Sequence, residues 1–463
     1  MSIYLGGNKT GDFYFGGTKI AKAYYGYVQV YPDIDWNPLN LPAYTMRFQF
    51  DNLNYNPTTS GYPWRSGATW AQISSNPNIW DYTRNDTNWG TNPNNILDKS
   101  DFCYQPSSAL SYLTTAFPSN QCTATHVLGA NTSNVTDMRV LFGDCNSLVE
   151  VNSFDTRQVT SFNSMFSGCS SLTSLPLFNT SNGINFSGML ANCSSLTTVP
   201  YLNTSNGTDF RYMFSGCSSL TSVPLLDTSG ATHVEGMFQL CSNLTTIPLY
   251  DFGNALYMGG MFQNSTSLVS IPNIDTSSAT DMLSMFNGCS ALTSVPLLDT
   301  SSVTSMYYMF SGCSSLTSVP LFDTSSVTTM SHMFANCTSL ASAPAFDLSN
   351  NPDVHGLFIG CSSMEYAPQL DTSGIRSFVS MFQNCTSLKA VPLYDTSSAT
   401  TVDWCFAGCS NVESGALALY NQMSTQTTPP QDHQYCFTNC GRDTVTGAAE
   451  LAQIPSSWGG TGT

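Results

Sequence analysis

The sequence predicts a mainly β repeat protein, a solenoid built from rungs of 24 residues. Cysteine recurs at this spacing from Cys145 to Cys409, and Ser265 replaces it once. Phenylalanine recurs three residues before the cysteine, and aspartate recurs ten residues after it. A constant period of this length indicates one structural unit stacked on copies of itself, so the chain is expected to be elongated and to offer a long binding surface.

Each rung is predicted to hold two short elements and a turn. Leu292 and Val295 are expected to point into the core from a strand, and Pro296 follows where a missing amide hydrogen does little harm. A second element begins near Val303, and residues 309–312 turn back towards the next cysteine. In-register stacking makes equivalent residues a structural ladder, represented by Cys289, Cys313, Cys337, Phe286, Phe310, Phe334, Asp299 and Asp323. Twelve rungs at roughly 4.8 Å would span about 60 Å.

The repeated cysteine is better explained as a small buried side chain than as a cross-link. Parallel side chains in register are poorly aimed for the dihedral angle of a disulfide. Substitution by Ser265 at the same position also favours a packing role. We therefore expect free thiols along the array.

Four segments are predicted along the chain. Residues 1–32 repeat Tyr-x-Gly-rich units at a spacing of ten and suggest a β-ribbon that docks on a partner. Residues 33–117 hold five of the seven tryptophans and a strand pattern at 44–50, and are expected to cap the first rung. Residues 118–415 form the solenoid. Residues 416–463 are expected to form a C-terminal cap and tail, with helix-forming residues at 447–452.

Composition narrows the classes of partner. The formal net charge is −17 and only 9% of the residues are charged, so no basic stripe is available to bind nucleic acid. The same charge disfavours adsorption to anionic membranes. No apolar run reaches ~18 residues, so membrane insertion is not expected. No apolar run of signal-peptide length follows Met1, and we expect export by another route, such as release with a virus particle.

The unit Met-Phe-x-x-Cys-x-x-Leu-x-x-x-Pro-x-x-Asp-Thr-Ser-x-Val-Thr-x-Met resembles the BspA-like leucine-rich repeat family of bacterial surface proteins. The resemblance covers about two thirds of the chain and implies a right-handed leucine-rich-repeat or β-solenoid fold, adhesion or receptor binding, and no enzyme activity. The N-terminal Tyr-Leu-Gly-Gly ribbon resembles modules of phage structural and fibre proteins. Without the anchor and sorting tail of secreted members, the chain is expected to be a virion fibre or decoration protein.

Candidate metal and catalytic groups have simpler explanations. The aspartate column could bind Ca²⁺, but Asn179 and Asn203 replace it, which favours turns in which the side chain accepts a backbone hydrogen bond. The pairs Cys405–Cys409 and Cys436–Cys440 have a spacing compatible with zinc, yet they follow the phase of the repeat. The five histidines are scattered. We expect no catalytic residue, metal or cofactor.

Side chains that vary between the paired methionines of each rung are the candidate binding residues. The neighbouring repeat residues barely change, which indicates an outward face on a fixed scaffold, although ordinary surface variation explains the pattern equally well. The variable residues include types favoured at recognition hot spots, namely Arg139, Arg211, Tyr212, Tyr307, Tyr308, His332, His355 and Trp404.

These observations lead to one functional hypothesis with two alternatives. The leading hypothesis is a phage virion protein, attached to another virion protein through residues 1–32, that binds a host-surface glycan or protein. Assembly as a homotrimer is expected from the way fibres assemble. The alternatives are a BspA-like adhesin on the bacterial surface and a carbohydrate-active enzyme of β-helix type.

Overall fold

The structure, a computed structural model, describes residues 13–15, 18–20, 45–49, 68–72, 79–84, 125–130, 132, 135–350 and 352–462. In the order of the chain, its helices and strands are β1 (Phe13–Phe15), β2 (Thr18–Ile20), β3 (Thr45–Gln49), β4 (Ala68–Gln72), β5 (Ile79–Arg84), β6 (His126–Ala130), β7 (Glu150–Val151), α1 (Ala416–Ser424), α2 (Val445–Leu451) and the 3₁₀ turn Ser456–Trp458. None of the described helices is long and apolar enough to cross a membrane.

The strands before the array form two sheets. β1 and β2 pair antiparallel within the predicted ribbon. The other five have the order β4-β5-β3-β6-β7, in which only the β6–β7 pair is parallel. β3 is the strand expected at 44–50, and β7 lies in the first rung, so this sheet continues into the array. The remainder of residues 1–32 and most of 33–117 lie outside the described residues, so the ribbon and the cap stay predictions.

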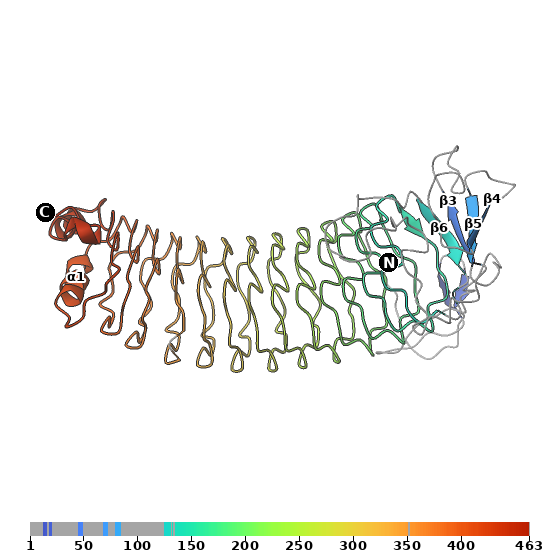
Figure 1. Ribbon diagram of the computed structural model, residues 1–463, viewed down its shortest axis with the longest axis horizontal. Coiled ribbons are helices and arrows are strands. Elements are labelled where there is room, and N and C mark those ends of the chain that lie inside the picture. Colours follow the sequence, from blue (N-terminus) through green and yellow to red (C-terminus); the bar gives the residue numbers. More distant parts are fainter. Residues whose placement is uncertain are drawn as a thin grey trace.

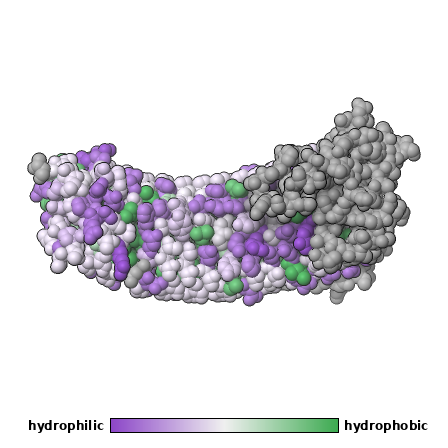
Figure 2. Space-filling model, viewed as in Figure 1, coloured by the Kyte–Doolittle hydropathy of each residue, from purple (hydrophilic) through white to green (hydrophobic). Residues whose placement is uncertain are grey.

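The array is a row of similar coils that runs from this sheet to α1 (Figure 1). Its outline is arched, and the face seen in Figure 2 is coloured mainly white and purple, with separate green hydrophobic patches. Successive rungs are joined by single parallel bridges, such as Asp281 to Ser305 and Ser305 to Thr329. The chain is therefore a repeat solenoid, as its period predicts, but most of each rung consists of turns and extended segments rather than strands.

The predicted strand at Leu292–Val295 is wrong. Inter-rung hydrogen bonds concentrate instead in the second element, where the amides of Met306, Tyr308, Phe310 and Gly312 donate to carbonyls of the next rung. The intervening amides close local turns, as Met309 does to the carbonyl of Met306 at 3.1 Å. Pro296 explains the difference, because a proline column lacks the amide hydrogens that a ladder of parallel strands requires.

Phenylalanine rings form a column through the buried core. The ring centroids of Phe286 and Phe310 are 5.3 Å apart with planes 3° from parallel, and Phe310 and Phe334 are 5.6 Å apart at 2°. All three rings are fully buried. Leu190 occupies the same position in one rung and is also buried. Each rung thus buries a face that its neighbours complete, which makes stability a property of the stack.

The cysteine column has a second role beyond filling space. From Cys169 to Cys409 the thiols of the column donate hydrogen bonds to the carbonyl of the residue at the phenylalanine position of the preceding rung, as Cys289 does to Phe262 at 3.0 Å. Ser265 makes the equivalent bond to Phe238 at 2.7 Å. The thiol or hydroxyl adds a second hydrogen bond to a buried carbonyl that already accepts from the backbone amide three residues later, and serine is an accepted substitute because it supplies the same donor. Fourteen cysteines in the described part of the chain are buried.

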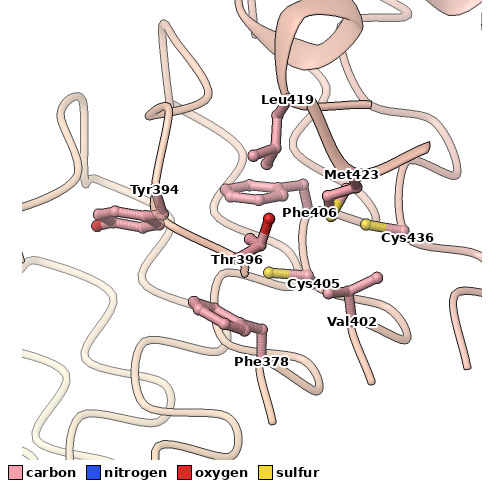
Figure 3. Close-up of a pocket in the computed structure, with 9 residues that line it drawn as sticks. All are labelled: Phe378, Tyr394, Thr396, Val402, Cys405, Phe406, Leu419, Met423 and Cys436. Atoms are coloured by element: carbon pink, nitrogen blue, oxygen red, sulfur yellow. The ribbon is translucent and has the colours of Figure 1, made fainter. Parts of the chain in front are cut away.

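Two helices close the C-terminal end. Glu450 of α2 accepts hydrogen bonds from the amides of Gly415 and Leu417 at the start of α1, at 3.3 and 3.1 Å. α2 lies where helix-forming residues predicted a helix, whereas α1 occupies a segment for which no helix was predicted. Figure 3 shows a small apolar cavity between α1 and the last full rung, lined by Leu419, Met423 and Cys405 among others. It has room for about one water molecule and is a packing gap.

Candidate functional site

The predicted binding residues lie along one surface, which we call the ladder face. It consists of the positions equivalent to Ser305, Tyr307 and Tyr308 in every rung. Met306 and Met309 on either side are fully buried, so the inter-rung hydrogen bonds hold the intervening side chains outward. Arg139, Arg211, Tyr307 and His355 occupy the Tyr307 position of their rungs, and Tyr212, Tyr308, His332 and Trp404 occupy the Tyr308 position.

Four of these side chains form a ring cluster across three consecutive rungs. The Tyr308 and His332 rings stack at 4.7 Å with planes 6° apart, and His332 stacks on His355 at 5.0 Å. Tyr307 packs edge-on against Tyr308 at 4.3 Å and keeps 37% of its surface exposed. Tyr308, His332 and His355 are each partly exposed, so the cluster offers ring surface suited to aromatic or sugar-ring contacts.

The two histidines of the ring cluster affect each other electrostatically. Burial lowers the pKa of His332, and the neighbouring His355 lowers it further, while Asp353 acts in the opposite direction. Ser331 Oγ lies 3.0 Å from His332 Nδ1, which holds the imidazole in place. Near neutral pH the His332 imidazole is therefore uncharged.

The arginines of the ladder face are held by aspartates of the same rung. Arg211 donates through Nε to Asp209 Oδ1 at 3.0 Å and through Nη2 to Asp209 Oδ2 at 2.6 Å. Arg139 donates through both Nε and Nη2 to a single oxygen, Asp137 Oδ2. Two donors held by one carboxylate restrain each guanidinium plane, and the side chains remain about half exposed. The arginines are separate from the ring cluster.

Trp404 belongs to a different group at the C-terminal end of the face. Its ring stacks on Tyr435 at 4.4 Å. The neighbouring Asp403 carboxyl has its pKa raised, chiefly by burial and then by Asp432. The sequence did not single out Tyr435, because the insertion before it breaks the 24-residue phase. It also did not single out His233 and Tyr257, whose rings stack at 5.5 Å in the Ser305 position of their rungs.

The backbone at the Tyr308 position is left-handed in every rung, with φ of 55° at Tyr212, 56° at Tyr308 and 58° at Trp404. The side chain then lies over the same position of the next rung, where there is either another ring or a glycine. A Cβ placed on Gly236 would come within 2.4 Å of the Tyr212 ring, and one on Gly356 within 2.9 Å of His332 Nε2. Gly236 and Gly356 each follow a ring, whereas Gly188 follows Ser164 and Gly260 follows Gly236, so a glycine in this column leaves room for a ring but does not by itself predict one.

We expect Gly236→Ala to lower the free energy of unfolding by about 1–2 kcal/mol, because alanine is strained at φ 59° and displaces the Tyr212 ring. Denaturant unfolding of the full-length wild type and variant measures this change in the free energy of unfolding. The control is Gly259→Ala, since a Cβ there meets its nearest neighbour at an ordinary 3.5 Å. Equal effects at the two glycines would contradict this packing, and Tyr212→Ala should relieve part of the cost at Gly236.

The aspartate column makes turns, in agreement with the favoured interpretation of the sequence. Asp299 Oδ1 accepts from the Ser301 amide at 3.1 Å and from Ser301 Oγ at 2.7 Å, and Asp323 repeats both bonds with Ser325. Asn179 accepts equivalent bonds from Ser181. Within the described ranges, no group of three or more His, Cys, Asp or Glu side chains is placed to hold a metal ion.

These hydrogen bonds make the free energy of unfolding depend on pH. The pKa of Asp323 is lowered by Ser325, first by its hydroxyl and then by its amide. A lowered folded-state pKa gives stabilisation that is fully present above the unfolded-state pKa, and it is lost as pH falls through the folded-state value. We expect Asp323→Asn, which keeps the acceptor, to reduce the loss of stability between about pH 4 and pH 2. Urea midpoints against pH test this; identical pH dependence in the variant and the wild type would contradict it.

Comparisons with known proteins agree with the repeat architecture. The model of a family described as "Mycoplasma protein of unknown function, DUF285" matches overlapping segments at residues 111–223, 178–270, 197–295, 257–369 and 352–428. Among solved structures, a leucine-rich repeat protein from Eubacterium ventriosum is 16% identical, with a TM-score of 0.31, and the match covers 57% of this chain and 82% of that one.

A TLR13–ssRNA13 complex is 14% identical over 56% of this chain and 42% of that chain, with a TM-score of 0.22. The comparison with curated proteins gave no match. The family assignment therefore depends on the repeat model, whose matches run without a gap from residue 111 to residue 428. Because they cover well over half of the sequence, the chain belongs to the DUF285 family.

Proposed function

We propose that this protein is an adhesin that binds a host-cell surface through the ladder face. The observation that carries the proposal is the ring cluster, in which Tyr307, Tyr308, His332 and His355 gather on an exposed surface above a nearly invariant core. Tyrosine and histidine rings held by backbone bonds lose little conformational freedom on binding. Rigid, partly exposed rings of this kind are typical of recognition sites.

The ligand class that fits is a surface glycan or a surface protein. Ring edges and hydroxyl groups offer apolar contact together with hydrogen bonding, and no strongly charged group lies within the cluster. The arginine pairs and the Trp404–Tyr435 stack lie on other rungs of the same face and offer additional weak contacts. Several weak contacts on an extended surface, repeated over many copies, give high overall avidity.

The test is binding of the full chain to host cells. We expect the triple variant Tyr307→Ala, Tyr308→Ala, His332→Ala to bind at least about tenfold more weakly, equivalent to about 1.4 kcal/mol. Leu283→Ala with Ser284→Ala is the matched control, because these residues occupy the same positions one rung earlier. Unchanged binding by the triple variant, with unfolding like that of the control, would overturn the proposal.

An adhesin could be displayed on a bacterial cell surface or on a virus particle. The family match supports a bacterial surface protein at least as well as a virion protein. The virion placement depends on the ribbon at residues 1–32, of which the structure describes residues 13–15 and 18–20. Immunogold labelling of purified particles and of particle-free cells decides between them. Gold label only on particles would identify a virion protein, and gold label only on cells would identify a bacterial surface protein. Sedimentation of the intact chain tests the proposed homotrimer.

We also propose that the chain is not an enzyme, since the repeated aspartates of the array are engaged in turns. Incubation with host polysaccharide tests this statement. Release of oligosaccharides by the purified chain, abolished by replacement of an aspartate or glutamate, would select the β-helix enzyme instead.

A further inference from the structure

A second surface of the array carries a column of exposed apolar side chains. They follow the repeat proline, and we call them the leucine edge. Leu249, Leu297 and Leu393 expose 63–64% of their surface, the highest values among the leucines of the array. Isolated exposed leucines are ordinary, whereas a column at one position of successive rungs is not. The edge consists of Leu177, Tyr201, Leu225, Leu249, Leu297, Leu321 and Leu393, with Asn273, Ala345 and Gln369 at the remaining positions.

The aspartate column lies beside the leucine edge. From Leu297 to Thr300 exposed and buried residues alternate: Leu297 and Asp299 are exposed, while Leu298 and Thr300 are buried. In an extended segment, residues two apart project to the same side. Thr300 Oγ1 fixes this orientation by donating to the Asp323 carbonyl of the next rung at 2.8 Å. One leucine and one carboxylate therefore project together from the rungs of Leu225, Leu249, Leu297, Leu321 and Leu393, whereas Leu177 and Tyr201 are paired with Asn179 and Asn203.

The carboxylates of this edge have few cations nearby. One oxygen of each accepts from the backbone amide two residues later, which belongs to a serine in most rungs and to Gly253 beside Asp251, and such a bond favours the charged form. The sequence from residue 212 to residue 375 contains no lysine and no arginine. At Gly253, a Cβ would lie 3.3 Å from Asp251 Oδ1 and 3.1 Å from Asp275 Oδ2, so carboxylates of adjacent rungs flank the same point. The edge thus joins an apolar column to a continuous negative one.

We propose that the leucine edge binds a cationic amphipathic helix of a partner polypeptide, laid along the axis of the array. The phenylalanine rings of adjacent rungs between Phe262 and Phe358 are 5.3–5.6 Å apart. One turn of an α-helix rises 5.4 Å, so a helix meets one rung per turn and keeps this register. A β-strand repeats every ~6.6–6.8 Å on one face and loses register within a few rungs.

The negative charge of the aspartate column distinguishes among the apolar partners that the leucine edge could bind. Lysine or arginine beside the apolar stripe of the helix would face one aspartate per rung. A second copy of this chain would place two negative columns against each other, and an anionic membrane would meet the same repulsion. The edge is distinct from the ladder face, so this inference does not depend on the adhesion proposal.

The probe is a synthetic 21-residue helix with leucine on one face and lysine on both flanks, titrated into the full chain. A peptide of the same composition in scrambled order is its control. We expect the patterned peptide to bind at least tenfold more tightly than the scrambled one. We expect Leu297→Ser with Leu321→Ser, and separately Asp299→Asn with Asp323→Asn, each to weaken binding at least tenfold. Asparagine keeps the turn, as Asn179 shows.

Equal binding of patterned and scrambled peptides would overturn the proposal, because general attraction to an acidic protein would then explain the result. Dimerisation in sedimentation that is lost in the Leu297→Ser, Leu321→Ser variant would show that the edge binds a second copy of the chain. Binding to anionic vesicles that is lost in the same variant would show that the edge binds lipid. Either result would overturn the proposal. Tyr308→Ala should leave peptide binding unchanged. Loss of host-cell binding in that variant therefore reports on the ladder face alone.

Discussion

Replacing Phe310 by alanine is expected to lower the free energy of unfolding by about 3–5 kcal/mol. The ring is fully buried and stacks on Phe286, Phe322 and Phe334 at 5.3, 5.9 and 5.6 Å, so its removal leaves a cavity that two neighbouring rungs share. In a stacked array each rung is stabilised mainly by its neighbours. The loss of stability should therefore be concentrated in the rung that contains Phe310 and in its two neighbours, and amide hydrogen exchange should be fastest there.

Denaturant unfolding of the full chain, with hydrogen exchange to locate the effect, makes this measurement. Leu297→Ala is the matched control, because it removes a leucine side chain that is 63% exposed. Its effect should stay within about 0.5 kcal/mol. A cost below about 1 kcal/mol at Phe310, or a loss of exchange protection spread evenly over the array, would contradict the stacked column.

The cysteine column should resist alkylation in the native state. Burial raises the pKa of Cys289, Cys361 and Cys409 to about 12. At pH 8 the reactive thiolate of such a group is about 10³-fold less populated than that of an exposed cysteine. Lack of access slows the reaction further. Fourteen described thiols are therefore expected to react at least about 10³-fold more slowly in the folded chain than in denaturant.

Mass spectrometry of the alkylated protein counts the protected thiols. Two variants calibrate the result. Ser265→Cys adds a cysteine to the buried column and should be protected like its neighbours, whereas Leu297→Cys adds one at an exposed position and should label at once. Rapid native labelling of Cys313 or Cys337 would show that the column is open to solvent.

The period in the sequence predicts the columns but not the hydrogen bonding between them. Phe310 and Cys313 could be placed in a common core because each recurs in phase with the others. The strand predicted there was wrong, since Leu292 and Val295 are three residues apart and a regular strand would direct them to opposite faces, and Pro296 removes a donor that a strand ladder needs. Backbone donors then pair where amides are available, in the segment from Met306 to Gly312.

The ladder face was predicted as a set of variable positions, and its grouping into clusters was not. Which rings meet depends on the left-handed backbone at the Tyr308 position, which directs each side chain over the next rung. Gly236 and Gly356 leave room for the Tyr212 and His332 rings, but Gly188 and Gly260 follow no ring, so glycine alone does not show which rings meet. Tyr435 and α1 were not predicted, because the insertion after the last full rung breaks the phase on which the sequence argument depends.

A crystal structure of the full chain tests the in-register stack most directly. Phe286, Phe310 and Phe334 should form one column, with successive ring centroids 5.3 and 5.6 Å apart and planes within a few degrees of parallel. Rings that point in unrelated directions, or that are separated by much more than one rung, would contradict both the fold and the two surfaces built on it.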